Sequence, residues 1–155
     1  MPAAAELTLR DVAYDDPLAV RLIDELQADM VRRYGGPDTT PVDPGEFAPP
    51  HGLFVVAEAG GDVVGCAGLR RHSGEDMELK RMYIRATHRR RGYAREVLAR
   101  LEDRARALGV SRLVLETGTA QPEAVALYAS AGYHAVDGFG HYRDEEESRS
   151  YAKDL

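Results

Sequence analysis

The stretch Glu78-Leu-Lys-Arg-Met-Tyr-Ile84, followed by Arg89-Arg-Arg-Gly92-Tyr-Ala94, decides how this sequence folds. The first part has the length and apolar content of a strand, and from Gly92 onward the apolar residues recur at helical spacing. A strand that turns tightly into a helix points several free backbone N–H groups at one spot, where the helix dipole adds partial positive charge. We therefore expect an anion site at this turn.

The residue types in the turn favour a phosphate group as the anion. Successive amides can form a concave nest for phosphate oxygens, and Gly92 lets the backbone approach a bulky diphosphate. The run Arg89–Arg91 adds charge, and the guanidinium group matches phosphate geometry. Two common nucleotide motifs do not fit, because the Gly-Lys-Ser/Thr ending of a P-loop is missing and the dinucleotide fingerprint needs more glycines.

Outward from this turn, the sequence predicts one mixed α/β domain over residues 1–155, in the order β-α-β-β-β-α-β-α-β-β. The first helix begins at Pro17 after Asp15 or Asp16, and residues 35–52 form a long loop of the kind that is often functional. Helices follow from Gly92 to Gly109 and over Pro122–Ala131. The expected strands are Glu6–Val12, Leu53–Ala59, Asp62–Arg70, Met77–Ile84, Arg112–Glu116, Tyr133–Val136 and Ser148–Ala152.

Composition narrows the functional classes. A net charge of −6 over 155 residues argues against general affinity for nucleic acid, and no apolar run is long enough to span a bilayer. The start at Met1–Glu6 lacks signal-peptide features, and a single cysteine, Cys66, suits a reducing cytoplasm. We interpret Cys66 as a small buried hydrophobe. The five histidines show no metal-ligand spacing, so we expect no metal.

The motifs together resemble those of the GNAT family of acetyl-CoA-dependent N-acetyltransferases. The family signature Arg/Gln-x-x-Gly-x-Gly/Ala matches as Arg89-x-x-Gly92-x-Ala94. The family's Ala-x-x-Leu-Tyr segment matches at Ala124–Tyr128, with Gly132-Tyr133 after it. The order of strands and helices agrees from roughly Glu6 to Lys153.

This resemblance implies where acetyl-CoA binds. The diphosphate would meet the amides of residues 90–95, and the pantetheine arm would pair with the backbone of Met82–Ile84. The arm would enter a slot where the strands 77–84 and 112–116 splay apart in a mostly antiparallel sheet flanked by helices. Gln121 stands where the family often has a cofactor-contacting Asn. The implied cofactor-binding set is Met82, Tyr83, Ile84, Arg89, Arg90, Arg91, Gly92, Tyr93, Ala94, Arg95 and Gln121.

Acetyl transfer needs a base for the amine, polarisation of the thioester carbonyl and a proton for the thiolate. By resemblance, Tyr128 is the candidate acid; the alternative is a core aromatic. Glu78 is the candidate base, because strand alternation puts it on the same face as Lys80 and Met82; the alternative is a salt-bridged Glu. A backbone amide near Met82 or Tyr83 would serve the oxyanion.

The expected function is acetyl transfer from acetyl-CoA to a primary amine of a small molecule, amino acid or peptide. The acidic segments Asp38–Glu46 and Asp144–Glu147 would favour a cationic amine if they line its pocket, and His141 with Tyr142 would line it as well. The rival class is a non-catalytic acyl-CoA-binding regulatory module, which needs neither Glu78 nor Tyr128. The resemblance also leaves room for a homodimer.

Overall fold

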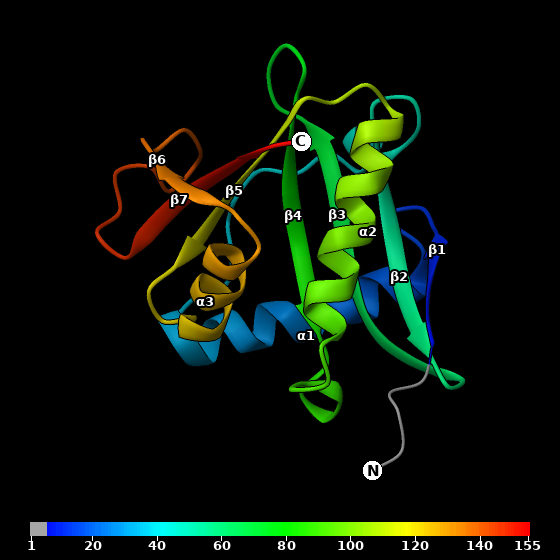
Figure 1. Ribbon diagram of the computed structural model, residues 1–155. Helices are drawn as coiled ribbons and strands as arrows, with labels where there is room; N and C mark the ends of the chain where they lie inside the picture. The colour runs from blue at the N-terminus through cyan, green and yellow to red at the C-terminus, as the bar shows by residue number, and fades with distance from the viewer. Residues whose placement is uncertain (1–5) are drawn as a thin grey trace.

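The computed structural model describes residues 6–155, and it contains one seven-stranded sheet with three α-helices (Figure 1). The strand order is β1-β2-β3-β4-β5-β7-β6, and only β4 and β5 pair in parallel. This arrangement confirms the predicted fold class. The elements are β1 (Leu7–Asp11), α1 (Pro17–Tyr34), η1 (Pro44–Phe47), β2 (Gly52–Ala59), β3 (Asp62–Arg71), β4 (Asp76–Ile84), η2 (Ala86–His88), α2 (Tyr93–Ala107), β5 (Arg112–Gly118), α3 (Pro122–Ser130), β6 (His134–Val136) and β7 (Ser148–Asp154).

The predicted order of elements is right, and the differences lie at their ends. Of the two aspartates before α1, Asp16 is the cap, and its carboxylate accepts from the Leu18 N–H at 2.9 Å. The segment 35–52, predicted as a loop, contains the 3₁₀ helix η1, which Asp43 and Glu46 close as a capping box. The start of the chain is expected to lack signal-peptide features, and its residues Met1–Ala5 lie outside the described residues.

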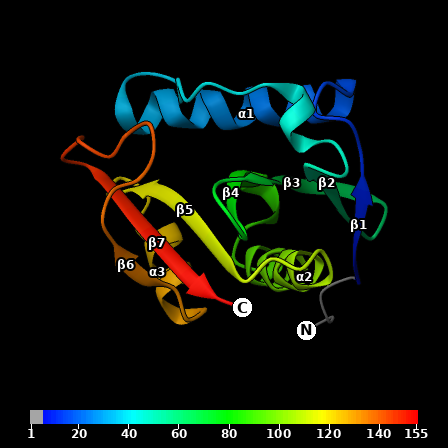
Figure 2. The ribbon, with the colours of Figure 1, turned by 90° about the horizontal axis from the view of Figure 1, so that it is seen from above.

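The sheet separates two helical layers. Figure 2 shows α1 on one face and α2 with α3 on the other. The core between the sheet and α1 contains Leu22 and Ile23 from the helix, together with Phe47, Phe54 and the buried Cys66. The opposite face packs against α2 and α3, and its core includes Met77, Leu79, Leu98, Leu101, Leu113 and Tyr128.

The strands β4 and β5 separate soon after they meet. Their parallel ladder joins only Asp76–Glu78 with Arg112–Val114, and beyond it the two ribbons diverge (Figure 1). Strand β5 continues in register with β7 to Gly118, and β4 continues with β3 to Ile84. Among the described residues, the part of β4 from Leu79 to Ile84 therefore has no ladder partner on its β5 side.

A β-bulge interrupts β4 at the same level. Gly68 faces Lys80 and Cys66 faces Tyr83, so Arg81 and Met82 together oppose one residue, Ala67. Arg81 has φ +56°, a conformation that costs a non-glycine residue roughly 1–2 kcal/mol. The extra residue reverses which face each following side chain occupies.

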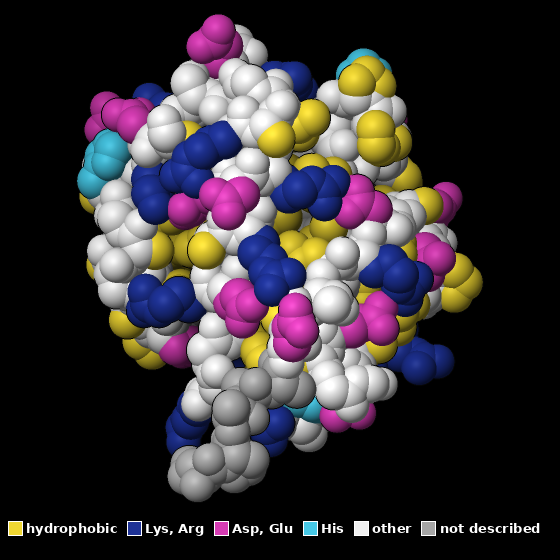
Figure 3. All heavy atoms as spheres, turned by 45° about the vertical axis from the view of Figure 1, so that its right-hand side comes forward, with side chains coloured by type: hydrophobic (Ala, Val, Ile, Leu, Met, Phe, Trp, Pro, Cys, Tyr) yellow, Lys and Arg dark blue, Asp and Glu magenta, His cyan; other side chains and the backbone are white. Residues whose placement is uncertain are grey.

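The surface carries mixed charge on the face seen in Figure 3, where basic and acidic side chains lie beside one another instead of forming a patch of one sign. Ion pairs such as Arg10–Glu58, Arg104–Asp11 and Arg100–Glu96 follow this pattern. None of the described helices is long and apolar enough to cross a membrane. Within residues 6–155, no group of three or more His, Cys, Asp or Glu could hold a metal ion.

We expect Gly68→Ala to destabilise the fold by about 1–3 kcal/mol, the usual cost of overpacking a core. An added Cβ would lie 2.7 Å from the ring of Phe47 and 2.8 Å from that of Phe54, and both rings are buried. Gly36→Ala is the control, because nothing lies within 4 Å of its Cβ. Urea unfolding measures both free energies, and equal values for the two variants would contradict the packing described here.

Candidate functional site

The turn between β4 and α2 leaves its backbone donors free. Gly92 is the N-cap of α2 with φ +82°, and no side chain caps the helix. The first helical hydrogen bond runs from the Glu96 N–H to the Gly92 carbonyl at 3.1 Å, so the amides of residues 93–95 have no helical acceptor. Arg90, at φ +65°, bends the turn further. This geometry suits an anion with several oxygens.

Arg89 holds the turn in place. Its Nε donates to the Ile84 carbonyl at 2.9 Å, its Nη2 lies 3.6 Å from the Asp29 carboxylate, and its guanidinium lies 5.7 Å from the centre of the Tyr83 ring. These contacts join the end of β4 to the buried Asp29 of α1. Arg89 therefore positions the loop, and Arg90 is better placed to meet a ligand.

A cleft of about 550 Å³ extends from this turn along the end of β4, with α1 and α3 as its other walls. All of the predicted cofactor-binding residues except Arg91 line it, and so does the candidate acid Tyr128. Sequence reasoning did not assign the lining residues that α1 and α3 supply. Their helical spacing marks them only as parts of amphipathic helices. They are Leu26, Asp29, Arg33, Glu123, Ala124 and Leu127.

The C-terminal end of α1 orients Gln121. The Tyr34 hydroxyl donates to Gln121 Oε1 at 3.2 Å, so the side-chain NH₂ of Gln121 keeps its donors. Arg33 Nη1 donates to the Ala120 carbonyl at 2.8 Å. A side chain at Gly118 would overlap the Tyr34 hydroxyl, and the glycine there allows this close approach. The helix thereby fixes the loop that follows β5.

Tyr128 combines a packing role with a polar group at the cleft. Its ring packs edge to face on Tyr133, with centroids 5.7 Å apart. Its hydroxyl lies 4.0 Å from the Met82 sulfur, at the limit of a weak contact. Burial raises the pKa of Tyr128, so the hydroxyl keeps its proton near neutral pH.

The prediction that Glu78, Lys80 and Met82 share one face is wrong for Met82. Lys80 Nζ lies 3.3 Å from Thr40 Oγ1, on the side of α1, whereas Met82 contacts Tyr128 of α3 on the other side. The bulge at Arg81 is the reason, because one extra residue reverses the alternation. Glu78 is buried and accepts from Arg70 Nε at 2.9 Å; it does not line the cleft.

Glu116 of β5 is a carboxylate that sequence reasoning missed. Its Oε2 accepts from the Tyr142 N–H at 3.1 Å, whereas its Oε1 is buried without a hydrogen-bond partner. Burial raises the pKa of this carboxyl group, and the nearby Lys80 only partly opposes the effect. The sequence signal was weak, because Glu116 reads as the last residue of an apolar strand.

Two loops meet over the bulge on the side of α1. The Tyr142 hydroxyl donates to Asp38 Oδ1 at 2.9 Å, and Thr39 Oγ1 lies 3.1 Å from His141 Nε2. Asp38 also pairs with the side chains of Arg81 and Lys80. Burial opposes ionisation of Asp38, but Lys80 and Arg81 outweigh it and hold the pKa below its usual range. The predicted acidic segment Asp38–Glu46 thus contributes one partly buried carboxylate, Asp38, whereas Asp144 of the other segment is exposed.

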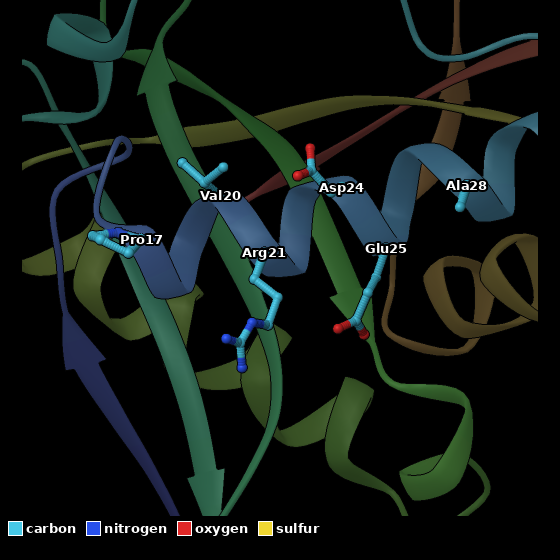
Figure 4. Close-up of a pocket in the computed structure, with 6 residues that line it drawn as sticks. All are labelled: Pro17, Val20, Arg21, Asp24, Glu25 and Ala28. Carbon is cyan, nitrogen blue, oxygen red and sulfur yellow. The ribbon is translucent and has the colours of Figure 1, made fainter.

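A second hollow of about 520 Å³ lies along the outer side of α1 (Figure 4). All of its lining residues come from this single helix: Pro17, Val20, Arg21, Asp24, Glu25 and Ala28. Glu25 is engaged by Arg85, with Oε2 and Nη2 2.7 Å apart. With walls from one element only, this hollow offers no converging polar groups of the kind found in the cleft at the end of β4.

The sequence of this chain is similar to those of known proteins. The model of the "Acetyltransferase (GNAT) family" matches residues 19–133. An "IAA acetyltransferase" of Azospirillum brasilense is 36% identical over 148 residues, which cover 93% of this chain and 97% of the relative. The "Uncharacterized N-acetyltransferase YjgM" of Escherichia coli is 30% identical, covering 88% of this chain and 84% of the relative.

Solved structures agree with the fold. A putative acyl-CoA N-acyltransferase from Klebsiella pneumoniae has a TM-score of 0.79 and 29% identity, and covers 96% of this chain and 97% of its own. A Bacillus subtilis acetyltransferase in complex with CoA, at 16% identity, has the same fold with a TM-score of 0.71, covering 97% and 99% of the two chains. The chain therefore belongs to the GNAT acetyltransferase family and is an acyl-CoA-dependent N-acetyltransferase.

Proposed function

We propose that the protein moves the acetyl group of acetyl-CoA directly to a primary amine of a small molecule, an amino acid or a peptide. The observation that carries this proposal is the cleft in which an unpaired stretch of β4 meets the uncapped N-terminus of α2. The amides at residues 93–95 and the side chain of Arg90 would receive the diphosphate. The name of the Azospirillum relative, an acetyltransferase for IAA, supports a small-molecule acceptor.

The pantetheine arm would run along β4 as an added strand. Met82, Tyr83 and Ile84 line the cleft beyond the end of the β4–β5 ladder, so their backbone groups are available on that side. Gln121, held through its Oε1 by Tyr34, would offer its NH₂ to a carbonyl of the arm. The thioester would then lie at the bulge, where the amide of Met82, which has no register partner in β3, or that of Tyr83 would donate to the oxyanion.

The transfer forms one C–N bond and breaks the C–S bond of the thioester. The amine nitrogen attacks the carbonyl carbon, and the nitrogen loses one proton as the thiolate leaves. Tyr128 would donate its hydroxyl proton to the thiolate, because it keeps that proton and its oxygen lies at the cleft beside Met82. The enzyme supplies no nucleophile, since holding the two reactants together provides much of the rate gain.

Two carboxylates are candidates for the base. Glu78 Oε1 is engaged by Arg70 Nε at 2.9 Å, so this oxygen already has a partner. Glu116 has a raised pKa and one oxygen without a partner. We propose Glu116 as the proton acceptor, acting directly or through a water, and we keep Glu78 as the alternative.

A non-catalytic acyl-CoA-binding module would need the cleft alone. The Tyr128 hydroxyl at the cleft favours catalysis, because a binding module has no use for a proton donor there. Turnover of acetyl-CoA with a panel of amines, followed by release of free thiol, tests the proposed function. Binding of acetyl-CoA without turnover of any amine would support the module instead.

We predict that Gly92→Val abolishes CoA binding and leaves the fold largely intact. The β-branched side chain would stand in the tight turn where the diphosphate must approach. Gly109→Val is the matched control, because Gly109 has a similar φ of +78° and open space around it, at the far end of α2. Calorimetric titration with acetyl-CoA measures the affinity. Wild-type affinity in a folded Gly92→Val variant would exclude this phosphate site.

The base is identified by comparing Glu116→Gln with Glu78→Gln. We expect Glu116→Gln to lower kcat/KM by about 10²-fold or more, and to remove the acidic limb of its pH profile. The raised pKa places this limb above the range of an ordinary glutamate, because the group must lose its proton to act. Glu78→Gln should lower turnover less, most at low pH, with CoA affinity unchanged. The reverse ranking would assign the base to Glu78.

For Tyr128→Phe we expect a loss of about 10²–10⁴ in acyl transfer with acetyl-CoA binding nearly unchanged. Only the hydroxyl is removed, so the ring still packs on Tyr133. Thioesters whose thiols are more acidic should suffer less from the mutation, since their thiolates need less help. Equal slowing for every leaving group, or unchanged rates, would show that Tyr128 is a packing residue.

A further inference from the structure

We infer that the acceptor is a zwitterion of the α-amino acid type, whose carboxylate binds Arg81 and Lys80 in the place that Asp38 occupies when the loops are closed. This inference rests on the proposed function and names its substrate class. The positive and negative groups of this cluster lie on different kinds of element. The two cations belong to the sheet, whereas the anion that neutralises them belongs to a loop.

The cations are fixed and deeply buried. The side chain of Arg81 is 4% exposed and that of Lys80 is 7% exposed. Both extend from β4 at the bulge, next to the proposed thioester position. Tyr14 accepts from Arg81 Nε at 3.3 Å, which holds the guanidinium in one orientation. Buried cations of this kind need an anionic partner at all times, because leaving one unpaired is strongly unfavourable.

Asp38, the present partner of the two cations, lies on a loop that contacts a second loop through a few side chains. Asp38 follows the Gly35-Gly36-Pro37 end of α1, and Tyr142 and His141 from the facing loop contact Asp38 and Thr39. Gln27 of α1 holds the backbone of Asp38, at 2.7 and 3.1 Å, so it is the side chain of Asp38 that turns away when the two loops part. When they part, Arg81 and Lys80 lose Asp38 and require another carboxylate.

The same movement uncovers a site for the amine. Gly140 lies so close to Glu116 Oε1 that an added Cβ would collide with it, so this loop covers the unpartnered oxygen. Tyr142 joins both ends of the site, since its N–H donates to Glu116 and its hydroxyl donates to Asp38. One loop therefore covers Oε1 of Glu116, which lacks a partner, and also binds the Asp38 carboxylate that pairs with the cations.

The remaining charges around the site are already matched. Arg70 is paired with Glu78 and Glu46, at 2.9 and 3.2 Å. An acceptor with an ammonium group for Glu116 and a carboxylate for Arg81 and Lys80 gives each of these three groups a partner, while the displaced Asp38 carboxylate turns to solvent. A diamine would instead bring a second cation against Arg81 and Lys80, and a simple amine would leave both of them unpaired when the loop opens.

The first experiment compares three acceptors with one side chain: an L-amino acid, its carboxamide and its decarboxylated amine. Rates are measured over pH and corrected for the neutral fraction of each amine. We expect kcat/KM to fall by about tenfold to a hundredfold from the amino acid to either analogue that lacks the carboxylate. This is the typical effect of losing one charge-assisted hydrogen bond. Equal values for the three acceptors would overturn the inference.

Two variants test the exchange of carboxylates. Lys80→Met should lower kcat/KM for the acid by a larger factor than for the two analogues without a carboxylate, so that most of the preference for the acid is lost. Asp38→Asn should lower KM for the acid and not for its carboxamide, because the competing carboxylate is gone. Asp24→Asn, an exposed aspartate of α1, is the control for the loss of one negative charge. Unchanged discrimination in both folded variants would also overturn the inference.

A binding measurement separates this inference from the proposed function. Thermal unfolding of the CoA-loaded enzyme is followed with each acceptor present, and only the amino acids should raise the Tm. If amino acids raise it but no amine is acetylated, the carboxylate site stands and the proposed function fails. If amines are acetylated without regard to a carboxylate, the proposed function stands and the carboxylate site fails.

Discussion

The bulge at Arg81 is the constraint on which the rest of this structure depends. It places two residues of β4 opposite Ala67, and beyond Glu78 the same strand has no ladder to β5. The positive φ of Arg81 is unfavourable for a side chain, and contacts of that side chain with Tyr14 and Asp38 offset the cost. The splay beyond Glu78 leaves the β5 side of the strand free, and the bulge also takes one residue out of the ladder to β3 where the thioester is proposed to lie.

The bulge also divides the chemistry between the two faces of the sheet. Lys80 and Arg81 face the layer of α1, whereas Met82 faces α3 and its Tyr128. The proposed proton donor and the proposed acceptor site therefore approach the slot from opposite sides. This separation suits direct transfer, because the leaving thiolate and the attacking amine lie on different sides of the carbonyl carbon.

Much of the fold could be predicted from local patterns. Glycines at the turns, proline at the start of α1 and helical spacing after Gly92 gave the right order of elements, because each signal acts over a few neighbouring residues. The splay after Glu78 followed only from the family resemblance. The bulge escaped prediction, since Arg81 carries no local signal for a positive φ, and the face assigned to Met82 was wrong for that reason.

The sequence by itself determined the turn with free amides at the start of α2, because Gly92 and the helix that follows it leave these amides unpaired through backbone geometry alone. It also determined the type of coenzyme through the motifs around Arg89 and Tyr128. Only the tertiary structure decided what surrounds the acceptor. Asp38, Arg81, Glu116 and Tyr142 lie far apart in the chain, and burial and pairing between distant segments give these charges their partners.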